Sequence, residues 1–354
     1  MIRSIVLNKK EIISLLSIDN EAELQQLFDK AYATKLQYVG KKVYFRGIIE
    51  ISNICIKNCY YCGIRRDNRE LERYEMDSEE VIEAALWAYD QRYGSIVIQS
   101  GEREDSRFIE KITKILRELK SRTSGRLGIT LSLGEQKKEV YKEWFDAGAH
   151  RYLLRVETTN EELYKKCHPA DHSLEQRITC LEALKELGYQ VGTGVLIGLP
   201  DQTLEDLAED ILFFHKHDID MIGMGPYIVH NNTPFNRFKT TTDNERNLQL
   251  ALKMIAVTRI FLRNVNIAST TALQAISPVG RELGLKAGAN IIMPVITDIK
   301  YRLQYLLYEG KPCLDENADQ CRDCLENRIR SIEEEIGYNE WGDSHHFMER
   351  KDRE

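Results

Sequence analysis

Short apolar runs alternate with amphipathic stretches from about residue 43 to residue 293. Runs such as Ser95-Ile96-Val97-Ile98-Gln99 have apolar residues at successive positions (96–98), as expected of strands buried on both faces. The stretches between them repeat apolar residues every three or four positions, which predicts helices packed by one face. In this way the pattern predicts eight strands, at residues 43–51, 95–99, 127–132, 151–155, 190–197, 221–227, 265–270 and 290–293.

Helices are predicted between these strands and ahead of the first one. Capping-box pairs mark three helix starts, because Asp77 precedes Glu80, Ser173 precedes Gln176 and Thr203 precedes Asp206 by three positions. The predicted helices cover residues 11–16, 21–36, 78–91, 107–120, 137–147, 173–187, 204–214, 245–262 and 278–287.

Buried strands that alternate with helices indicate a parallel sheet, and eight such units predict a complete (β/α)8 TIM-type barrel. A doubly wound open sheet is the structural alternative. The chain has 354 residues and no Gly/Ser-rich linker, which favours one large domain with appended segments. We therefore expect N-terminal helices capping the barrel (1–40), the barrel itself (41–296) and a C-terminal extension (297–354).

The amino-acid composition argues against some classes of function. Hydrophobic residues make up 42% and charged residues 30% of the chain, as in globular proteins. A net charge of −7 argues against a nucleic-acid partner, and no apolar run approaches the ~18 residues that a membrane span needs. The first seven residues lack the apolar core of a signal peptide. We expect a cytoplasmic protein, in which the eight cysteines are metal ligands or buried thiols rather than disulfides.

Three cysteines cluster directly after the first predicted barrel strand. Cys55, Cys59 and Cys62 have the spacing C-x3-C-x2-C, and the loops at this end of a barrel build its active site. Three thiolates suit three irons of a 4Fe–4S cube and leave the fourth iron free for a small chelating molecule. A structural zinc site is the alternative, but it needs four ligands and no fourth Cys or His is near in sequence.

This motif in this position resembles the radical S-adenosylmethionine (SAM) superfamily. The resemblance implies a 4Fe–4S cluster held by Cys55, Cys59 and Cys62, SAM on the fourth iron, and cleavage of SAM to a 5′-deoxyadenosyl radical. It also implies SAM-binding roles for Tyr61 in the cysteine loop and for Arg177 early in a later helix. The other implied SAM-binding residues lie at the ends of later strands: Ser100, Gly101, Glu102, Ser132, Glu157 and Leu196.

Longer segments are similar to the HydE family of FeFe-hydrogenase maturases. They include Leu131-Ser132-Leu133-Gly134-Glu135, Gly198-Leu199-Pro200 and Tyr308-Glu309-Gly310-Lys311. The resemblance implies an organometallic iron–cysteine substrate with CO and cyanide, on the way to the dinuclear iron centre of hydrogenase. Its pocket residues map to Thr130, Arg155, Thr270, Thr271, Met293, Tyr305 and Tyr308. One departure from the family pattern is Val156, at a position where the family often has His. This departure leaves the identity of the substrate undecided.

The same resemblance implies an auxiliary 2Fe–2S or 4Fe–4S cluster at Cys313, Cys321 and Cys324, for which zinc with help from His345-His346 is the alternative. It further implies a reductant such as ferredoxin or flavodoxin, and other hydrogenase maturases as partners.

Rival functions remain. A methylornithine synthase-like mutase, acting on an amino-acid-derived substrate, is the main enzymatic rival, and a non-catalytic iron–sulfur scaffold is the rival from another class. Biotin synthase fits poorly, because its second cluster needs cysteines on barrel strands.

Overall fold

The computed structural model describes residues 8–353, so the first seven residues, where no signal peptide is expected, lie outside the described part. Eight strands close into a parallel barrel, each hydrogen-bonded to the next and the last to the first. They are β1 (Lys42–Ser52), β2 (Ser95–Ser100), β3 (Gly128–Ser132), β4 (Arg151–Leu153), β5 (Gln190–Ile197), β6 (Met221–Pro226), β7 (Asn266–Ser269) and β8 (Ile291–Ile292). The closed barrel confirms the predicted fold class and excludes the open sheet.

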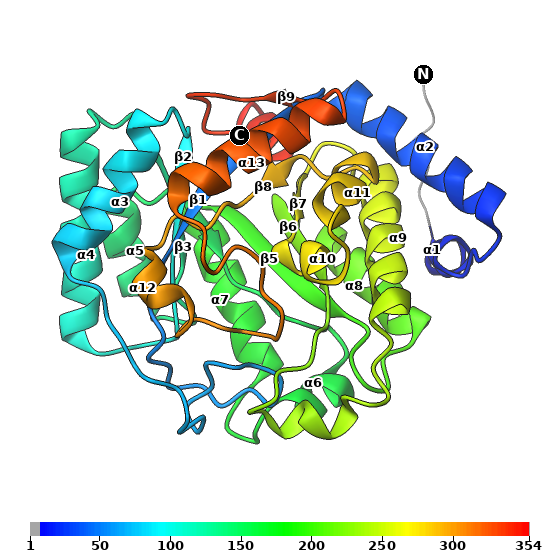
Figure 1. The fold of residues 1–354 in the computed structure, drawn as a ribbon, viewed down its shortest axis with the longest axis horizontal. Coiled ribbons are helices and arrows are strands. Elements are labelled where there is room, and N and C mark those ends of the chain that lie inside the picture. Colours follow the sequence, from blue (N-terminus) through cyan, green and yellow to red (C-terminus); the bar gives the residue numbers. More distant parts are fainter. Residues whose placement is uncertain (1–7, 354) are drawn as a thin grey trace.

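An outer layer of helices surrounds the strands (Figure 1). It comprises α3 (Ser78–Asp90), α4 (Ser106–Arg122), α5 (Lys138–Asp146), α6 (Glu161–Cys167), α7 (Leu174–Glu186), α8 (Leu204–Lys216), α9 (Asn244–Leu262), α10 (Thr271–Ile276) and α11 (Gly280–Lys286), with a short 3-10 helix at Pro234–Phe238. Asp77 and Thr203 form the capping boxes expected of them. Ser173 accepts a hydrogen bond from the Gln176 amide without the reciprocal bond.

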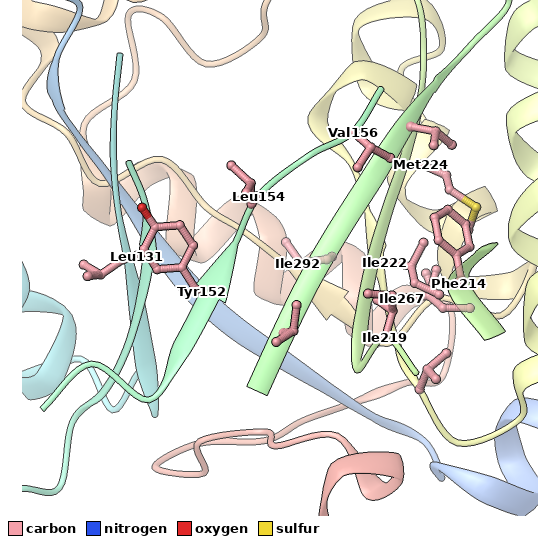
Figure 2. Close-up of a cluster of buried hydrophobic side chains, with 14 of the residues drawn as sticks. Leu131, Tyr152, Leu154, Val156, Phe214, Ile219, Ile222, Met224, Ile267 and Ile292 are labelled. Carbon is pink, nitrogen blue, oxygen red and sulfur yellow. The ribbon is translucent and has the colours of Figure 1, made fainter. Parts of the chain in front are cut away.

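The main hydrophobic core lies between the strands and this helical layer. Side chains such as Phe108, Ile112 and Leu116 form one buried stripe on α4, spaced as the 3.6-residue period requires. Figure 2 shows another part of the core, where Phe214 of α8 lies near Ile219 and Ile222 of the β6 region. Within residues 8–353, no helix is long and apolar enough to cross a membrane.

In the described residues 8–353, two helices precede the barrel and four elements follow it. The first are α1 (Lys9–Leu16) and α2 (Glu21–Tyr38), which contact α8, α9 and α11 of the outer layer. The last are α12 (Ile299–Arg302), α13 (Ala318–Ser331), β9 (Glu335–Ile336) and α14 (His345–Lys351). The division of the chain at residues 40 and 296 stays a prediction.

Residues of the C-terminal segment close one end of the barrel. The Gly342 carbonyl accepts hydrogen bonds from Arg46 of β1 and Asn266 of β7. Arg151 of β4 donates to the Trp341 carbonyl, over 2.9 Å, and to Asp343 Oδ1, over 2.6 Å. These contacts lie at the N-terminal ends of the strands, so the opposite end is left for the functional loops. In Figure 1, β9 and the C-terminus accordingly lie at one end and α6 at the other.

Candidate functional site

The cysteine loop begins where β1 ends, at the open end of the barrel. Pairing between β1 and β2 shifts register between Glu50 and Ser52, and such an irregularity redirects a chain next to a site. Arg73 then fixes the loop from inside, because its guanidinium donates to five backbone carbonyls of residues 53–68. One charged side chain therefore satisfies carbonyls that an irregular loop would otherwise leave unpaired.

The three thiols of the loop belong to half-buried cysteines. Burial raises the pKa of Cys59 to about 12, and it also raises those of Cys55 and Cys62. Thiolates at this place therefore need positive charge, which iron supplies. The three sulfur atoms do not all lie within 4.8 Å of one another, whereas one tetrahedral ion with Zn–S bonds of about 2.3 Å holds sulfurs about 3.8 Å apart. The donor set thus fits an iron–sulfur cube better than a single zinc ion.

The end of β2 packs against this loop. The Glu102 amide donates to Cys55 Sγ over 3.3 Å, and the Ile56 amide donates to the Glu102 carbonyl over 2.9 Å. A side chain at Gly101 would place its Cβ 2.4 Å from the Ile54 carbonyl oxygen, so only glycine allows this contact. Gly101 and Glu102, predicted to bind cofactor, therefore lie next to Cys55 and the cysteine loop. Ser100 Oγ donates to the Gly101 carbonyl.

Four charged side chains, all of them largely buried, form a network of ion pairs beside the thiols. Lys57 Nζ lies 3.3 Å from Glu102 Oε1 and 2.9 Å from Glu135 Oε2. Arg177 lies 3.5 Å from Glu102 and 2.9 Å from Glu135. Glu102 is 5% exposed, and burial raises its pKa. The network brings together the predicted residues Glu102 and Arg177, and it adds two that sequence reasoning missed.

The missed residues are Lys57 and Glu135. Glu135 had a readable signal, because Gly134-Glu135 after β3 repeats the Gly101-Glu102 pair after β2. Gly134 has a φ of +81°, and a Cβ there would lie 2.2 Å from Glu102 Cγ. The second Gly-Glu pair therefore makes room for the first carboxylate. Ser132, at the end of β3, is half-buried nearby in sequence.

Arg155 and Glu157 follow β4, and their side chains meet in an ion pair. Arg155 binds both carboxylate oxygens of Glu157 and also donates to the Gly223 and Val195 carbonyls, over 2.9 and 2.8 Å. Glu157 has a φ of +65°, an uncommon backbone conformation for a residue other than glycine. Such strain concentrates at functional positions, and here it aims the carboxylate at Arg155.

Val156 faces the other way. It is fully buried in the main hydrophobic core, with Leu154 and Met224, and Figure 2 shows it beside Met224. The departure from the family's His therefore affects packing between strand and helix. It does not change a side chain of the barrel mouth.

Aromatic rings surround the remaining side of the cysteine loop. Tyr61 Oη lies 3.3 Å from His168 Nε2, and the two rings meet edge-to-face. Tyr61 and Leu196 both pack against a small cluster that includes Cys167 and Tyr227. Cys167 ends α6 and its carbonyl accepts a hydrogen bond from the Tyr60 amide, so this short helix contacts the cysteine loop.

The residues expected to line the substrate pocket belong to β3 and to segments that follow β4, β7, β8 and α12. Thr130 is fully buried and its Oγ1 accepts a hydrogen bond from Arg151 Nε over 3.0 Å. Thr270 Oγ1 is buried without a hydrogen-bond partner among residues 8–353, and Thr271 Oγ1 accepts from Arg281 over 3.1 Å. Tyr305 is buried, with its Oη 3.3 Å from Gln99 Nε2. Met293 and Tyr308 are half-buried.

The cysteines of the C-terminal extension are only partly brought together. Cys313 and Cys321 lie close to each other and to Glu316, which sequence reasoning missed, whereas Cys324 is exposed and outside this group. The histidines offered as zinc ligands have other partners: His345 Nδ1 lies 2.8 Å from the Tyr38 carbonyl and His346 Nε2 lies 2.5 Å from Asp218 Oδ1. An auxiliary cluster at the cysteine trio stays a prediction.

A parallel (β/α)8 barrel with C-x3-C-x2-C at its open end defines a radical SAM enzyme, and the Radical SAM superfamily model matches residues 49–214. The chain is 45% identical over 328 residues to the [FeFe] hydrogenase maturase subunit HydE of Thermotoga maritima, covering 92% of this chain and 91% of that protein. The chain therefore belongs to the HydE family of radical SAM enzymes.

More distant relatives share the fold. The 3-methylornithine synthase of Methanosarcina acetivorans is 27% identical over 301 residues, covering 84% of this chain and 81% of that protein. Among solved structures, methylornithine synthase aligns with a TM-score of 0.80 at 22% identity, over 94% of this chain and 95% of that one. HydG from Carboxydothermus hydrogenoformans aligns with a TM-score of 0.77 at 22% identity, over 92% of this chain and 75% of that one.

Proposed function

We propose that this enzyme acts in the assembly of the dinuclear iron subsite of FeFe-hydrogenase, on an iron–cysteine precursor that carries CO and cyanide. The identity of 45% with a HydE maturase over nearly the full length of both chains is the observation that carries the proposal. The substrate itself comes from the family resemblance.

The cofactor-binding roles are assigned to residues whose chemistry fits. Cys55, Cys59 and Cys62 would hold the 4Fe–4S cluster, and the cluster with SAM supplies, when bound, the electron that cleaves SAM to an adenosyl radical. A buried carboxylate such as Glu102 accepts hydrogen bonds from an amine, and an arginine fork such as Arg177 binds a carboxylate. These two side chains therefore suit the two ends of an amino acid.

The other proposed SAM contacts are assigned from the positions of their residues near the cysteine loop. Tyr61 and Leu196 offer an apolar and aromatic surface for adenine, supported by their packing on one small cluster. Ser100, Gly101, Ser132 and Glu157 stay proposed SAM contacts on the strength of their places at strand ends.

The substrate pocket is assigned to the barrel interior. The residues proposed to line it are Thr130, Arg155, Thr270, Thr271, Met293, Tyr305 and Tyr308. Hydroxyl and guanidinium donors suit cyanide and carboxylate groups. Thr270 Oγ1 has no hydrogen-bond partner in the described part of the chain, and this supports the assignment, because a buried hydroxyl without a partner is costly unless a ligand satisfies it.

The cellular setting is proposed on the same basis. We expect a cytoplasmic enzyme that takes electrons from a ferredoxin or flavodoxin and works with other hydrogenase maturases. Nucleic acid is not among its expected partners.

Two alternatives are distinguished by specific features. A methylornithine synthase-like mutase is favoured by the TM-score of 0.80, but the sequence identity to that group is 27% or less. A non-catalytic scaffold is disfavoured by the network of Lys57, Glu102 and Arg177, since a carrier of clusters needs no amino-acid site.

Complementation tests the proposal. The chain is expressed in a host that makes FeFe-hydrogenase and lacks its own HydE, and hydrogen evolution is measured. We expect activity with the parent chain and none with Cys59→Ser. Failure of a chain that carries its cluster and cleaves SAM would contradict the hydrogenase role and favour the mutase.

A further inference from the structure

Two histidines in the segment after α6 contact the cysteine loop. His172 Nε2 accepts a hydrogen bond from the Asn58 amide over 3.1 Å, so it binds the backbone of the loop. His168 reaches a side chain instead, because its Nε2 lies 3.3 Å from the Tyr61 hydroxyl. His168 therefore contacts the aromatic ring that is assigned to the adenine side of the SAM site.

The surroundings of His168 decide which ring nitrogen carries hydrogen. Its Nδ1 lies 2.8 Å from the Tyr164 carbonyl oxygen, which can only accept, so Nδ1 carries a hydrogen. Burial lowers the pKa of His168 to about 3, so the ring is neutral near pH 7 and its Nε2 carries none. Nε2 is therefore an acceptor, and Tyr61 must be the donor in the bond between them.

The Tyr61 hydroxyl is able to donate this bond. Burial raises the pKa of Tyr61 well above its ordinary value, so the hydroxyl keeps its hydrogen. The two rings meet edge-to-face with centroids 5.4 Å apart, and this contact and the bond together define the tilt of the Tyr61 ring. Cys59 also lies near Tyr61, and its sulfur is the competing acceptor for the same hydrogen.

His168 is itself held firmly from the side of α6. It is 4% exposed, and the Tyr164 ring of α6 stacks on it with centroids 3.9 Å apart at an angle of 24°. The imidazole is thus fixed by a packed helix, whereas Tyr61 belongs to an irregular loop. A side chain locked by packing can hold a neighbouring loop residue in one orientation.

We propose that His168 is a positioning residue for the adenine side of the SAM site, and that it acts by accepting the hydrogen bond of the Tyr61 hydroxyl. The proposal rests on the proposed role of Tyr61 and deepens it, because it identifies what holds that ring in place. SAM affinity should then depend on the acceptor at Nε2 rather than on the size of the imidazole.

Two amide substitutions separate the two ring nitrogens. The amide of His168→Gln reaches the position of Nε2 and offers an acceptor oxygen, whereas the shorter amide of His168→Asn reaches only the position of Nδ1. The Kd for SAM is measured by equilibrium binding to the anaerobically reconstituted enzyme. His168→Asn should raise this Kd about three- to tenfold, as for the loss of one neutral hydrogen bond, and His168→Gln less than about twofold.

A second histidine provides the matched control. His217 is also half-buried and its ring also packs on an aromatic side chain, that of Phe213, but it lies at the end of α8 that precedes β6. His217→Asn should leave the Kd for SAM unchanged. Iron and sulfide content and circular dichroism check that each variant is folded and carries its cluster.

A double-variant cycle tests whether His168 and Tyr61 act as a unit. Tyr61→Phe should raise the Kd by about the same factor as His168→Asn, and the double variant should raise it no further, because both changes remove the same bond. Ligand fragments give a readout that a general loosening of the site would not produce. The Kd for 5′-deoxyadenosine should rise together with that for SAM, whereas the Kd for methionine should stay unchanged.

The reduction potential of the cluster without SAM separates the two acceptors of the Tyr61 hydroxyl. Hydrogen bonds to cluster sulfurs change this potential. Tyr61→Phe should leave the potential unchanged, because the hydroxyl is committed to His168. A lower potential in Tyr61→Phe would show that the hydroxyl donates to Cys59, and it would overturn the proposal. This measurement and the affinity of Tyr61→Phe test the same bond if His168→Asn fails to fold.

Three results of the binding experiments would also overturn the proposal. They are an unchanged Kd for SAM in His168→Asn, an equal rise in His168→Gln, and independent effects of His168→Asn and Tyr61→Phe that multiply in the double variant. Failure of the proposed function gives a different result. In that case complementation fails, while the parent binds and cleaves SAM and the His168 variants differ from one another as expected.

Discussion

Arg155 and Glu157 form a two-point ion pair just after β4, in which Arg155 Nε and Nη2 donate to the two Glu157 carboxylate oxygens over 2.9 Å each. Glu157 makes this contact from a backbone conformation with a positive φ of +65°. The barrel mouth thus contains a charge pair whose partners lock each other's orientation.

Removing one charge of this pair should destabilise the fold. Glu157→Gln leaves the Arg155 guanidinium largely buried with only neutral acceptors. We expect the free energy of unfolding to fall by about 1–3 kcal/mol, below the range for a fully buried pair because Arg155 keeps some solvent contact. Urea denaturation of the metal-free protein measures this. The exposed Glu161→Gln should change stability by less than about 0.5 kcal/mol, and an equal loss in both variants would contradict the account.

Neutralising Glu102 should weaken SAM binding and leave the cluster intact. Glu102→Gln keeps the shape and an acceptor oxygen but removes the charge offered to an amine. Charge-assisted hydrogen bonds contribute about 1.5–3 kcal/mol, so the Kd for SAM should rise about 10- to 100-fold. Equilibrium binding to the reconstituted enzyme measures this, with iron and sulfide content as the check on the cluster. Glu104→Gln, on an exposed neighbour, should leave the Kd unchanged. An unaltered Kd in Glu102→Gln would remove this carboxylate from the SAM site.

Gly134 and Gly125 offer a matched comparison. Both have a positive φ, +81° and +73°, but a Cβ at Gly134 meets the Glu102 side chain at 2.2 Å whereas one at Gly125 meets nothing within 4 Å. Each alanine variant should lose about 1 kcal/mol or more for the backbone. Only Gly134→Ala should also raise the Kd for SAM, because it displaces Glu102. Equal SAM affinity in the two variants would show that Gly134 does not position this carboxylate.

Asp210 should make stability depend on pH. Burial raises the pKa of Asp210 to about 7. Two hydrogen bonds lower this pKa in part, because the Thr159 amide and hydroxyl donate to Asp210 Oδ1 over 2.8 and 2.6 Å. A raised carboxyl pKa means that the contribution to stability is full below about pH 4 and is lost as pH rises through 7, by up to about 4 kcal/mol.

Asp210→Asn is neutral at every pH, so its stability relative to the parent should increase between pH 5 and pH 8. Urea unfolding of the metal-free protein at both values measures the difference. The exposed Glu205→Gln on the same helix should show no such trend. A parent that gains stability relative to Asp210→Asn with rising pH would reverse the assignment.

Most of the fold could be predicted from the sequence, because its strands are buried on both faces and stand out as apolar runs. All eight strands were expected, although β8 is only Ile291–Ile292 and β4 only Arg151–Leu153. The helix α6 was missed because seven residues are too few to show a period. The stripe of Cys321, Leu325 and Ile329 on α13 was readable at a four-residue spacing and marks a helix that the sequence reading left out.

The site was predictable only in part. The cysteine motif and the strand ends locate Glu102 and Glu157, because the barrel gathers its βα loops at one end. Arg177 lies early in α7, where the family resemblance pointed to it. Contacts between loops distant in sequence carry no local pattern, so the pairing of Lys57 with Glu102 and Glu135 could not be read from the chain. The same reason hid Glu316, which joins the C-terminal thiols only when the extension has folded.

The central claim is that three thiolates at the barrel mouth hold a 4Fe–4S cluster with one iron open to SAM. Its most direct test is the EPR spectrum of the anaerobically reconstituted and reduced enzyme before and after addition of SAM, with 5′-deoxyadenosine measured in the same sample. The account predicts a changed spectrum and formation of 5′-deoxyadenosine in the parent and in the control Cys180→Ser, and neither in Cys59→Ser. A cluster whose spectrum ignores SAM, in a protein that makes no 5′-deoxyadenosine, would contradict it.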